Sequence, residues 1–156
     1  MTTTLTKSDG TQARELIAFR LGQQEFCLDV MNVREIRGWT PVTPLPHAPS
    51  YMLGVINLRG TVLPIIDLSA RMGFAPAEPS TRHAIMVVEM GKQVIGFLVD
   101  AVSEIFSGKD DDIQPTPDVA SAATRNLIQG VIAGEGRMIS VLSLDRIAAT
   151  SEVMAA

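Results

Sequence analysis

The sequence is poor in the side chains that bind metals, form disulfides or stack on nucleobases. It contains one cysteine and two histidines among 156 residues, and aromatic residues make up 4%. The single thiol, Cys27, cannot form an internal disulfide, which favours a reducing compartment. No aromatic stripe is present for base stacking, and the net charge of −4 comes without a lysine or arginine cluster. The sequence therefore predicts neither a nucleic-acid partner nor binding to an anionic membrane.

Long apolar runs are also missing. No stretch of about 18 consecutive apolar residues occurs that could cross a bilayer. Residues 1–15 contain no apolar core of a signal peptide. We therefore expect a cytoplasmic protein without direct membrane insertion.

The residue types used in catalysis are scarce and lack suitable neighbours. His47 lies in a proline-rich loop and His83 at the start of a predicted strand, and neither has a second histidine or cysteine at ligand spacing. Cys27 has no nearby base in the sequence, so a buried thiol is favoured over a nucleophile. Gly108-Lys109 lacks the flanking residues of a phosphate loop, and Asp110–Asp112 lacks the glycine and glutamate of a calcium loop. The sequence predicts no catalytic residue, no metal ion and no cofactor.

The chain does contain enough apolar residues for a core, arranged with a period of two. Apolar residues make up 46% and charged residues 19%, which is typical of a globular protein. The length fits one domain, expected at residues 15–150, after a flexible polar tail at residues 1–14. From Leu16 onward apolar and polar side chains alternate, which predicts β-strands.

The predicted strands are short and are joined by tight turns or proline-containing loops. The clearest hairpin runs from Gly54 to Leu68 and turns at Arg59-Gly60, where the glycine can adopt a positive φ. Pro64 in its second arm cannot donate a ladder hydrogen bond, so this arm is expected at a sheet edge or a bulge. Helices are expected at Ala120–Gln129 and, more clearly, at Leu144–Met154. The other strands are expected at Leu16–Leu21, Phe26–Val30, Val33–Arg37, His83–Met90, Gln93–Val99 and Val102–Ser107, with loops at 41–49, Phe74–Arg82 and Gly108–Pro117.

The second half of the chain repeats the first. Shifted by 76 positions, Gly54-Val55-Ile56 aligns with Gly130-Val131-Ile132. Shifted by 69 positions, Val33-Arg34-Glu35-Ile36 aligns with Val102-Ser103-Glu104-Ile105. This predicts two tandem β units that share a core, because each unit alone is small.

We place these units at about residues 15–82 and 83–143, with the C-terminal segment packing back onto the first. Their short, hairpin-rich strands favour small barrels over one open sheet. The hairpin tips differ between the two copies: Asn57-Leu58-Arg59 in the first corresponds to Ala133-Gly134-Glu135 in the second. Arg59 is therefore either a solvated turn residue or a specialised contact for a partner carboxylate.

Three segments of the sequence resemble the CheW family of bacterial chemotaxis adaptors. They are Phe26–Gly38, Gly54–Leu68 and Val94–Ile105, and the order and spacing match from about Glu15 to Ala149. The most specific part is Gly-Val-Ile-Asn-Leu-Arg-Gly followed by Pro-Ile-Ile-Asp-Leu. The resemblance implies a mainly β fold of two tandem five-stranded SH3-like β-barrels, with short helices and a C-terminal helix. It also implies a non-enzymatic adaptor that couples methyl-accepting chemoreceptors to the histidine kinase CheA.

The resemblance further implies where partners bind. The family contacts the cytoplasmic tip of the chemoreceptor and the regulatory domain of CheA, and its members are monomers in isolation that assemble in receptor arrays. Cys27 departs from the family pattern, where a small residue, often glycine, is usual; this concerns strand packing more than binding. Carried over residue by residue, the receptor-binding surface comprises Val33, Glu35, Gly54, Asn57, Arg59, Val102 and Ile105.

Other functions stay open from the sequence. The chain could serve a related chemosensory pathway, such as twitching, or act as a small-ligand-sensing β-barrel. A ligand sensor needs convergent polar groups in an apolar pocket, and the sequence points to none. An enzyme that uses Cys27 is the third alternative. No kinase or receiver segment is attached, so a stand-alone adaptor is expected.

Overall fold

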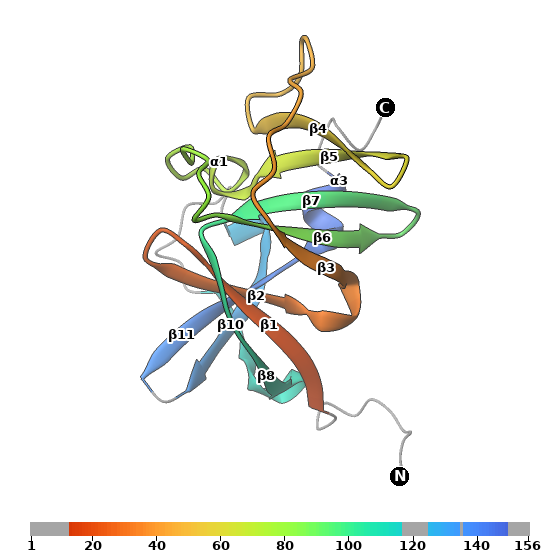
Figure 1. Cartoon of the computed structure of the whole chain (residues 1–156). Helices are drawn as coiled ribbons and strands as arrows, with labels where there is room; N and C mark the ends of the chain where they lie inside the picture. The colour runs from red at the N-terminus through yellow and green to blue at the C-terminus, as the bar shows by residue number, and fades with distance from the viewer. Residues whose placement is uncertain (1–12, 117–124, 135, 150–156) are drawn as a thin grey trace.

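The strands form two sheets, described for residues 13–116, 125–134 and 136–149 of a computed structural model (Figure 1). This confirms the predicted mainly β, two-barrel fold. The first barrel has the strand order β8 (Ala101–Lys109), β1 (Ala13–Leu21), β2 (Gln24–Asp29), β11 (Arg137–Leu142), β10 (Ile128–Gly134) and β9 (Ile113–Gln114). The second barrel has the order β3 (Val33–Gly38), β6 (Ala84–Met90), β7 (Gln93–Val99), β5 (Thr61–Asp67) and β4 (Met52–Leu58). The short helices are η1 (Val30–Asn32), α1 (Leu68–Arg71), η2 (Asp110–Asp112) and α3 (Leu144–Ala149).

The two barrels exchange strands between the sequence repeats. By the repeat offsets, β3, β4 and β5 correspond to β8, β10 and β11, while β1 and β2 correspond to β6 and β7. The first barrel takes β1 and β2 from the first repeat and its other strands from the second. The second barrel does the reverse, and equivalent strands occupy equivalent places in both orders. Even the parallel pairs correspond, β2 with β11 and β7 with β5.

The expected division into units at 15–82 and 83–143 is therefore wrong as a boundary between the barrels. The second barrel consists of strands between residues 33 and 99, and the first is built from the chain on both sides of it. An internal repeat shows which strands of the two halves are equivalent. It does not show whether a strand pairs with strands of its own half or of the other half. The chain passes between barrels at η1 and at Asp100, the residue between β7 and β8.

The β4–β5 hairpin accommodates its proline inside the sheet. The expected edge or bulge at Pro64 is wrong, because β5 lies between β7 and β4 and the register shift is at Met52–Gly54 of β4. Pro64 lies opposite Val55 of β4. The N–H and C=O of Val55 point away from β5 and form hydrogen bonds with Thr43, both at 2.9 Å. The proline nitrogen thus faces β7, where pairing with β5 begins only at Ile65. No ladder hydrogen bond is lost.

Alternate side chains of the strands fill different cores. On β6, Ile85 and Val87 face the interior of the second barrel, while Met86 and Val88 belong to a core shared by both barrels. Each fully buried side chain of this kind contributes about 1.5–3 kcal/mol. The shared core predicted from the size of the repeats is confirmed. It also includes Ile147 of α3, so the C-terminal segment packs back onto the molecule.

The observed ends of the predicted tail and of the two predicted helices differ from those expected. Residues 1–12 of the predicted tail lie outside the described residues, and residues 13 and 14 pair with β8 in β1. The predicted helix at Leu144–Met154 is confirmed through Ala149, and residues beyond it are not described. In the predicted helix at Ala120–Gln129, only residues 125–129 are described, and Ile128 already begins β10.

Helix α1 and strand β9 are among the short elements that were not predicted. Helix α1 begins after Asp67, whose Oδ1 accepts a hydrogen bond from the backbone N–H of Ala70 at 3.4 Å. Strand β9 lies in the expected loop and pairs with β10, which makes the first barrel six-stranded where five strands were expected. The second barrel has only a single bridge at the corresponding place, between Thr43 and Val55.

Candidate functional site

The turn between β4 and β5 presents Arg59 in a fixed conformation. Arg59 and Gly60 are the two central residues of a tight turn, with φ of 53° and 86°. Positive φ at both positions matches the right-handed twist of the flanking strands. Asn57 helps to hold the turn, since its Oδ1 accepts a hydrogen bond from the Gly60 N–H at 2.9 Å. The arginine side chain itself is 71% exposed.

Arg59 is paired within the chain. Its Nη2 lies 2.8 Å from Oε1 of Glu35 on β3, and Nη1 of Arg37 lies 3.1 Å from Oε2 of the same carboxylate. The hydrogen bond from Arg59, followed by that from Arg37, lowers the pKa of Glu35. The predicted partner contact and the predicted acidic residue thus form one ionised cluster across the second barrel. Because Arg59 is mostly exposed, its bond to Glu35 contributes little to folding, and its guanidinium keeps N–H groups that face solvent.

The other predicted binding residues have different environments. Val33 and Val102 are half-buried and pack against the shared core. Ile105 on β8 is 57% exposed. Gly54 is buried, has a φ of 149°, and lies so close to Thr43 that a Cβ would overlap the Thr43 carbonyl oxygen. Among the predicted binding residues, Glu35 and Arg59 are therefore bonded to each other. Gly54 is required by packing, because no other residue fits so close to Thr43.

The first barrel has an equivalent cluster that sequence reasoning missed. Glu104 on β8 is the repeat equivalent of Glu35, and its Oε2 lies 2.8 Å from Nη1 of Arg137. Arg137 also binds both oxygens of Glu25 on β2, at 2.7 and 3.1 Å. Hydrogen bonding to Glu25 and Glu104 raises the pKa of Arg137, and the same bonds with Arg137 lower the pKa of Glu25. The repeat of Glu35 as Glu104 was the signal in the sequence that could have revealed this cluster. The arginine was hidden, because Arg137 lies two positions beyond the repeat equivalent of Arg59.

Exposed apolar side chains also occur in equivalent pairs. Ile36 on β3 is 44% exposed and Val62 on β5 is 64% exposed. Their repeat equivalents, Ile105 and Met138, are each 57% exposed in the first barrel. Single exposed apolar residues are common on protein surfaces, but here the same two positions are exposed in both barrels. Each barrel thus carries an exposed apolar pair and an arginine–glutamate cluster.

The candidate residues for chemistry, Cys27 and His83, have different environments. Cys27 is buried, and desolvation raises the pKa of its thiol to about 12. His83 lies between Ser80 and Asp100: its Nδ1 is 3.4 Å from Oγ of Ser80, and its Nε2 is 3.3 Å from Oδ1 of Asp100. Among residues 13–116, 125–134 and 136–149, no three His, Cys, Asp or Glu side chains are grouped as metal ligands. Within the same ranges, no helix is long and apolar enough to span a bilayer.

The model of the CheW-like domain matches residues 15–152. The chain is 60% identical over 143 residues to the chemotaxis protein CheW of Rhizobium meliloti, covering 92% of each chain. It is 31% identical to the chemotaxis protein CheW of Klebsiella aerogenes over 143 residues, covering 92% of this chain and 86% of the relative.

A solved structure agrees with these relatives. The crystal structure of the scaffolding protein TtCheW from Thermoanaerobacter tengcongensis superposes with a TM-score of 0.78 at 28% identity, covering 90% of this chain and 91% of that one. The chain belongs to the CheW-like family and is a chemotaxis coupling adaptor.

Proposed function

We propose that this adaptor joins the cytoplasmic tip of a methyl-accepting chemoreceptor to the regulatory domain of the histidine kinase CheA, in the cytoplasm and without catalysis of its own. The observation that carries the receptor assignment is the cluster of Glu35 and Arg59. Its arginine is held at the end of a rigid turn and is mostly exposed. A partner carboxylate can replace water on the outer face of this guanidinium without breaking the bond to Glu35.

The receptor surface combines charge with apolar contact. It comprises Val33, Glu35, Gly54, Asn57, Arg59, Val102 and Ile105. We assign Ile105 to affinity because its exposed side chain would be removed from water on docking. The arginine–glutamate cluster provides register and selectivity, since a like charge from a wrong partner would be repelled. Gly54 contributes indirectly, by allowing the backbone to approach Thr43 behind the turn.

For the kinase we propose a contact through Ile36 and Val62, the exposed apolar pair of the second barrel. Both side chains lie outside the receptor surface, whereas Ile105 of the first barrel belongs to it. CheA contains a domain related to this one, as the family resemblance implies, so it can offer matching surfaces. An adaptor in an array needs more than one contact, and the repeat provides two equivalent faces.

The receptor assignment is tested by reversing one charge. Receptor fragment, CheA and the full chain are combined, and phosphorylation of CheA by ATP is measured with Arg59→Glu and with wild type. We expect receptor-dependent activation to fall by about tenfold or more, while the thermal unfolding midpoint stays close to that of wild type. Lys109→Glu, which makes the same charge change outside the receptor surface, is the control. Normal activation by Arg59→Glu would refute the receptor assignment.

A further inference from the structure

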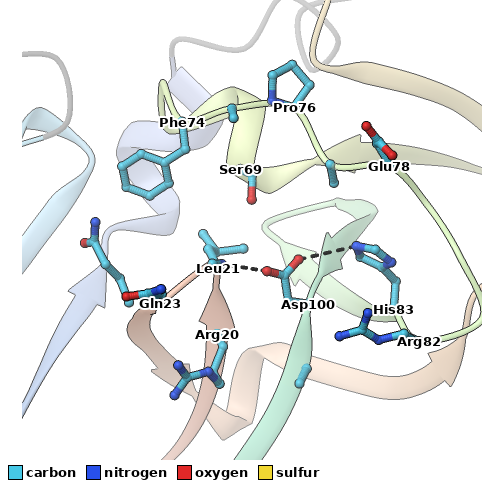
Figure 2. A pocket seen from close by; sticks show the side chains of 15 residues that line it. Arg20, Leu21, Gln23, Ser69, Phe74, Pro76, Glu78, Arg82, His83 and Asp100 are labelled. Atoms are coloured by element: carbon cyan, nitrogen blue, oxygen red, sulfur yellow. Dashed lines mark hydrogen bonds and ion pairs between the residues drawn. The ribbon is translucent and has the colours of Figure 1, made fainter.

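A pocket of about 610 Å³ lies where the two barrels meet (Figure 2). The first barrel contributes the turn between β1 and β2. The second contributes α1 and the linker of residues 74–83 that leads to β6, and Asp100 lies at the crossing between them. None of the seven residues of the receptor surface lines this pocket.

The walls of the pocket are held together by Asp100. Its Oδ2 accepts a hydrogen bond from the Gly22 N–H at 2.6 Å, and its Oδ1 lies 3.3 Å from Nε2 of His83. Nδ1 of His83 accepts a hydrogen bond from the Ser80 N–H at 3.2 Å, which leaves the Nε2 proton for Asp100. The Asp100 N–H in turn donates to the carbonyl of Arg20 at 3.0 Å. Both oxygens of Asp100 are therefore occupied by groups of the protein itself.

Two arginines at this pocket make no salt bridge among the described residues. Arg20 faces Glu25 in the register of β1 and β2, and its charge helps to lower the pKa of Glu25, but both oxygens of Glu25 bind Arg137. Arg82 donates only its backbone N–H, to Oγ of Ser80 at 3.2 Å. In the part of the chain that the structure describes, neither guanidinium makes a hydrogen bond or an ion pair. Both remain able to bind an anion.

The hydroxyl group of a serine on α1 also faces the pocket. Ser69 on α1 is only 6% exposed, and its side chain points toward the hollow in Figure 2. Among the described residues its hydroxyl makes no hydrogen bond. A ligand acceptor in the pocket would give this hydroxyl a hydrogen-bond partner.

The remaining lining is largely apolar. Phe74 packs its ring against Phe26, with centroids 6.1 Å apart, and lies in the wall with Leu21 and Pro76. Glu78 is the one acid at this pocket without a partner among the described residues, and it is exposed. An anion is therefore favoured beside the arginines and disfavoured beside Glu78.

We propose that the pocket binds a small organic carboxylate. Its charged oxygens pair with Arg20 and Arg82, Ser69 donates its hydroxyl proton to it, and its carbon skeleton lies against Phe74 and Pro76. Planar guanidinium groups match carboxylate geometry, and the volume holds several carbon atoms in addition. This site goes beyond the adaptor function, which requires no small ligand.

The probe for the test is succinate, a four-carbon dicarboxylate, titrated into the full chain. Amide resonances are followed by two-dimensional NMR at constant ionic strength, with the neutral analogue succinamide as the matched control ligand. We expect saturable shifts confined to residues around the pocket, including Gly22, Ala77 and Ala101, with a Kd below about 1 mM. Succinamide should cause no saturable shift.

The variants separate the arginine contacts from a general charge effect. Arg20→Gln and Arg82→Gln should each weaken succinate binding by about tenfold, and Ser69→Ala by a smaller factor. Arg34→Gln removes an arginine of the second barrel that is paired with Glu89 outside the pocket, and should leave binding unchanged. The proposal is overturned if succinate causes no saturable shift, if succinamide binds equally well, or if neither arginine variant weakens binding. Receptor-dependent kinase activation is a separate measurement, so failure here would leave the adaptor assignment standing.

Discussion

Glu35 on β3 and Glu104 on β8 lie at equivalent positions of the two barrels, and each binds an arginine from a hairpin of its own barrel. The distance is 2.8 Å in both cases, to Arg59 and to Arg137. The two arginines differ in their surroundings. Arg137 also binds Glu25 in a bidentate pair, whereas Arg59 is 71% exposed. The first barrel therefore uses its cluster internally, and the second keeps an arginine accessible to a partner.

Exchanging the charges of Glu35 and Arg59 distinguishes a bond within the chain from a contact with the receptor. The double variant Glu35→Arg with Arg59→Glu keeps an opposite-charge pair at the same place. If Arg59 acts through the receptor, the exchange places a negative charge at the hairpin tip, and we expect receptor-dependent CheA activation to stay as low as in Arg59→Glu. Activation is measured with the reconstituted receptor, adaptor and kinase. Recovery of wild-type activation would show that the pair acts only within the chain.

Gly54→Ala should destabilise the fold. The new Cβ would overlap the Thr43 carbonyl oxygen, and an L residue at a φ of 149° is strained. We expect the free energy of unfolding to fall by about 2–4 kcal/mol, measured by urea titration. Gly38→Ala is the matched control, because a Cβ there meets nothing within 4 Å. Equal stabilities of the two variants would contradict the account of Gly54 as a packing requirement.

The bond between Glu25 and Arg137 should make stability depend on pH. Hydrogen bonding from Arg137 holds the folded-state pKa of Glu25 below its ordinary value of 4.5. A depressed pKa stabilises the folded state above the unfolded value, and this stabilisation is lost as the pH falls through the folded value. Wild type should exceed Glu25→Gln in urea midpoint at pH 7, and the difference should shrink below about pH 4.5. Glu78→Gln, at a residue without a described partner, should show no such trend. A difference that grows in acid would have the wrong sign.

The thiol of Cys27 should be unreactive in the folded protein. Because burial raises its pKa to about 12, only about one molecule in ten thousand carries a thiolate at pH 8. Alkylation by iodoacetamide, monitored by mass spectrometry, should be at least about a hundredfold slower in buffer than in 8 M urea, because the unfolded chain has a much larger thiolate fraction. Rapid labelling of the folded chain would reopen the possibility of a nucleophilic Cys27.

Sequence patterns sufficed wherever the signal was local. Alternation of apolar side chains identified most strands, Arg59-Gly60 identified the turn, and the internal repeat predicted the shared core. The elements that were missed depend on distant pairing. Strand β9 exists because Ile113 and Gln114 meet β10, and no alternation of two residues could predict it. Pro64 is tolerated inside a sheet because β7 begins to pair one residue later, which is likewise a property of the assembled sheet.

The sequence by itself determined the mainly β class, the two equivalent barrels, the scarcity of catalytic side chains and the difference between the two hairpin tips. These follow from local patterns that a single chain displays in its order of residues. Only the tertiary structure decided that each barrel combines strands from both repeats and that Arg59 is bonded to Glu35. It also decided that Glu104 binds Arg137, which lies two positions beyond the repeat equivalent of Arg59. The physical reason is that two copies of similar strands allow more than one pairing. Which pairing is stable depends on burial of the shared core, where side chains far apart in the chain come together.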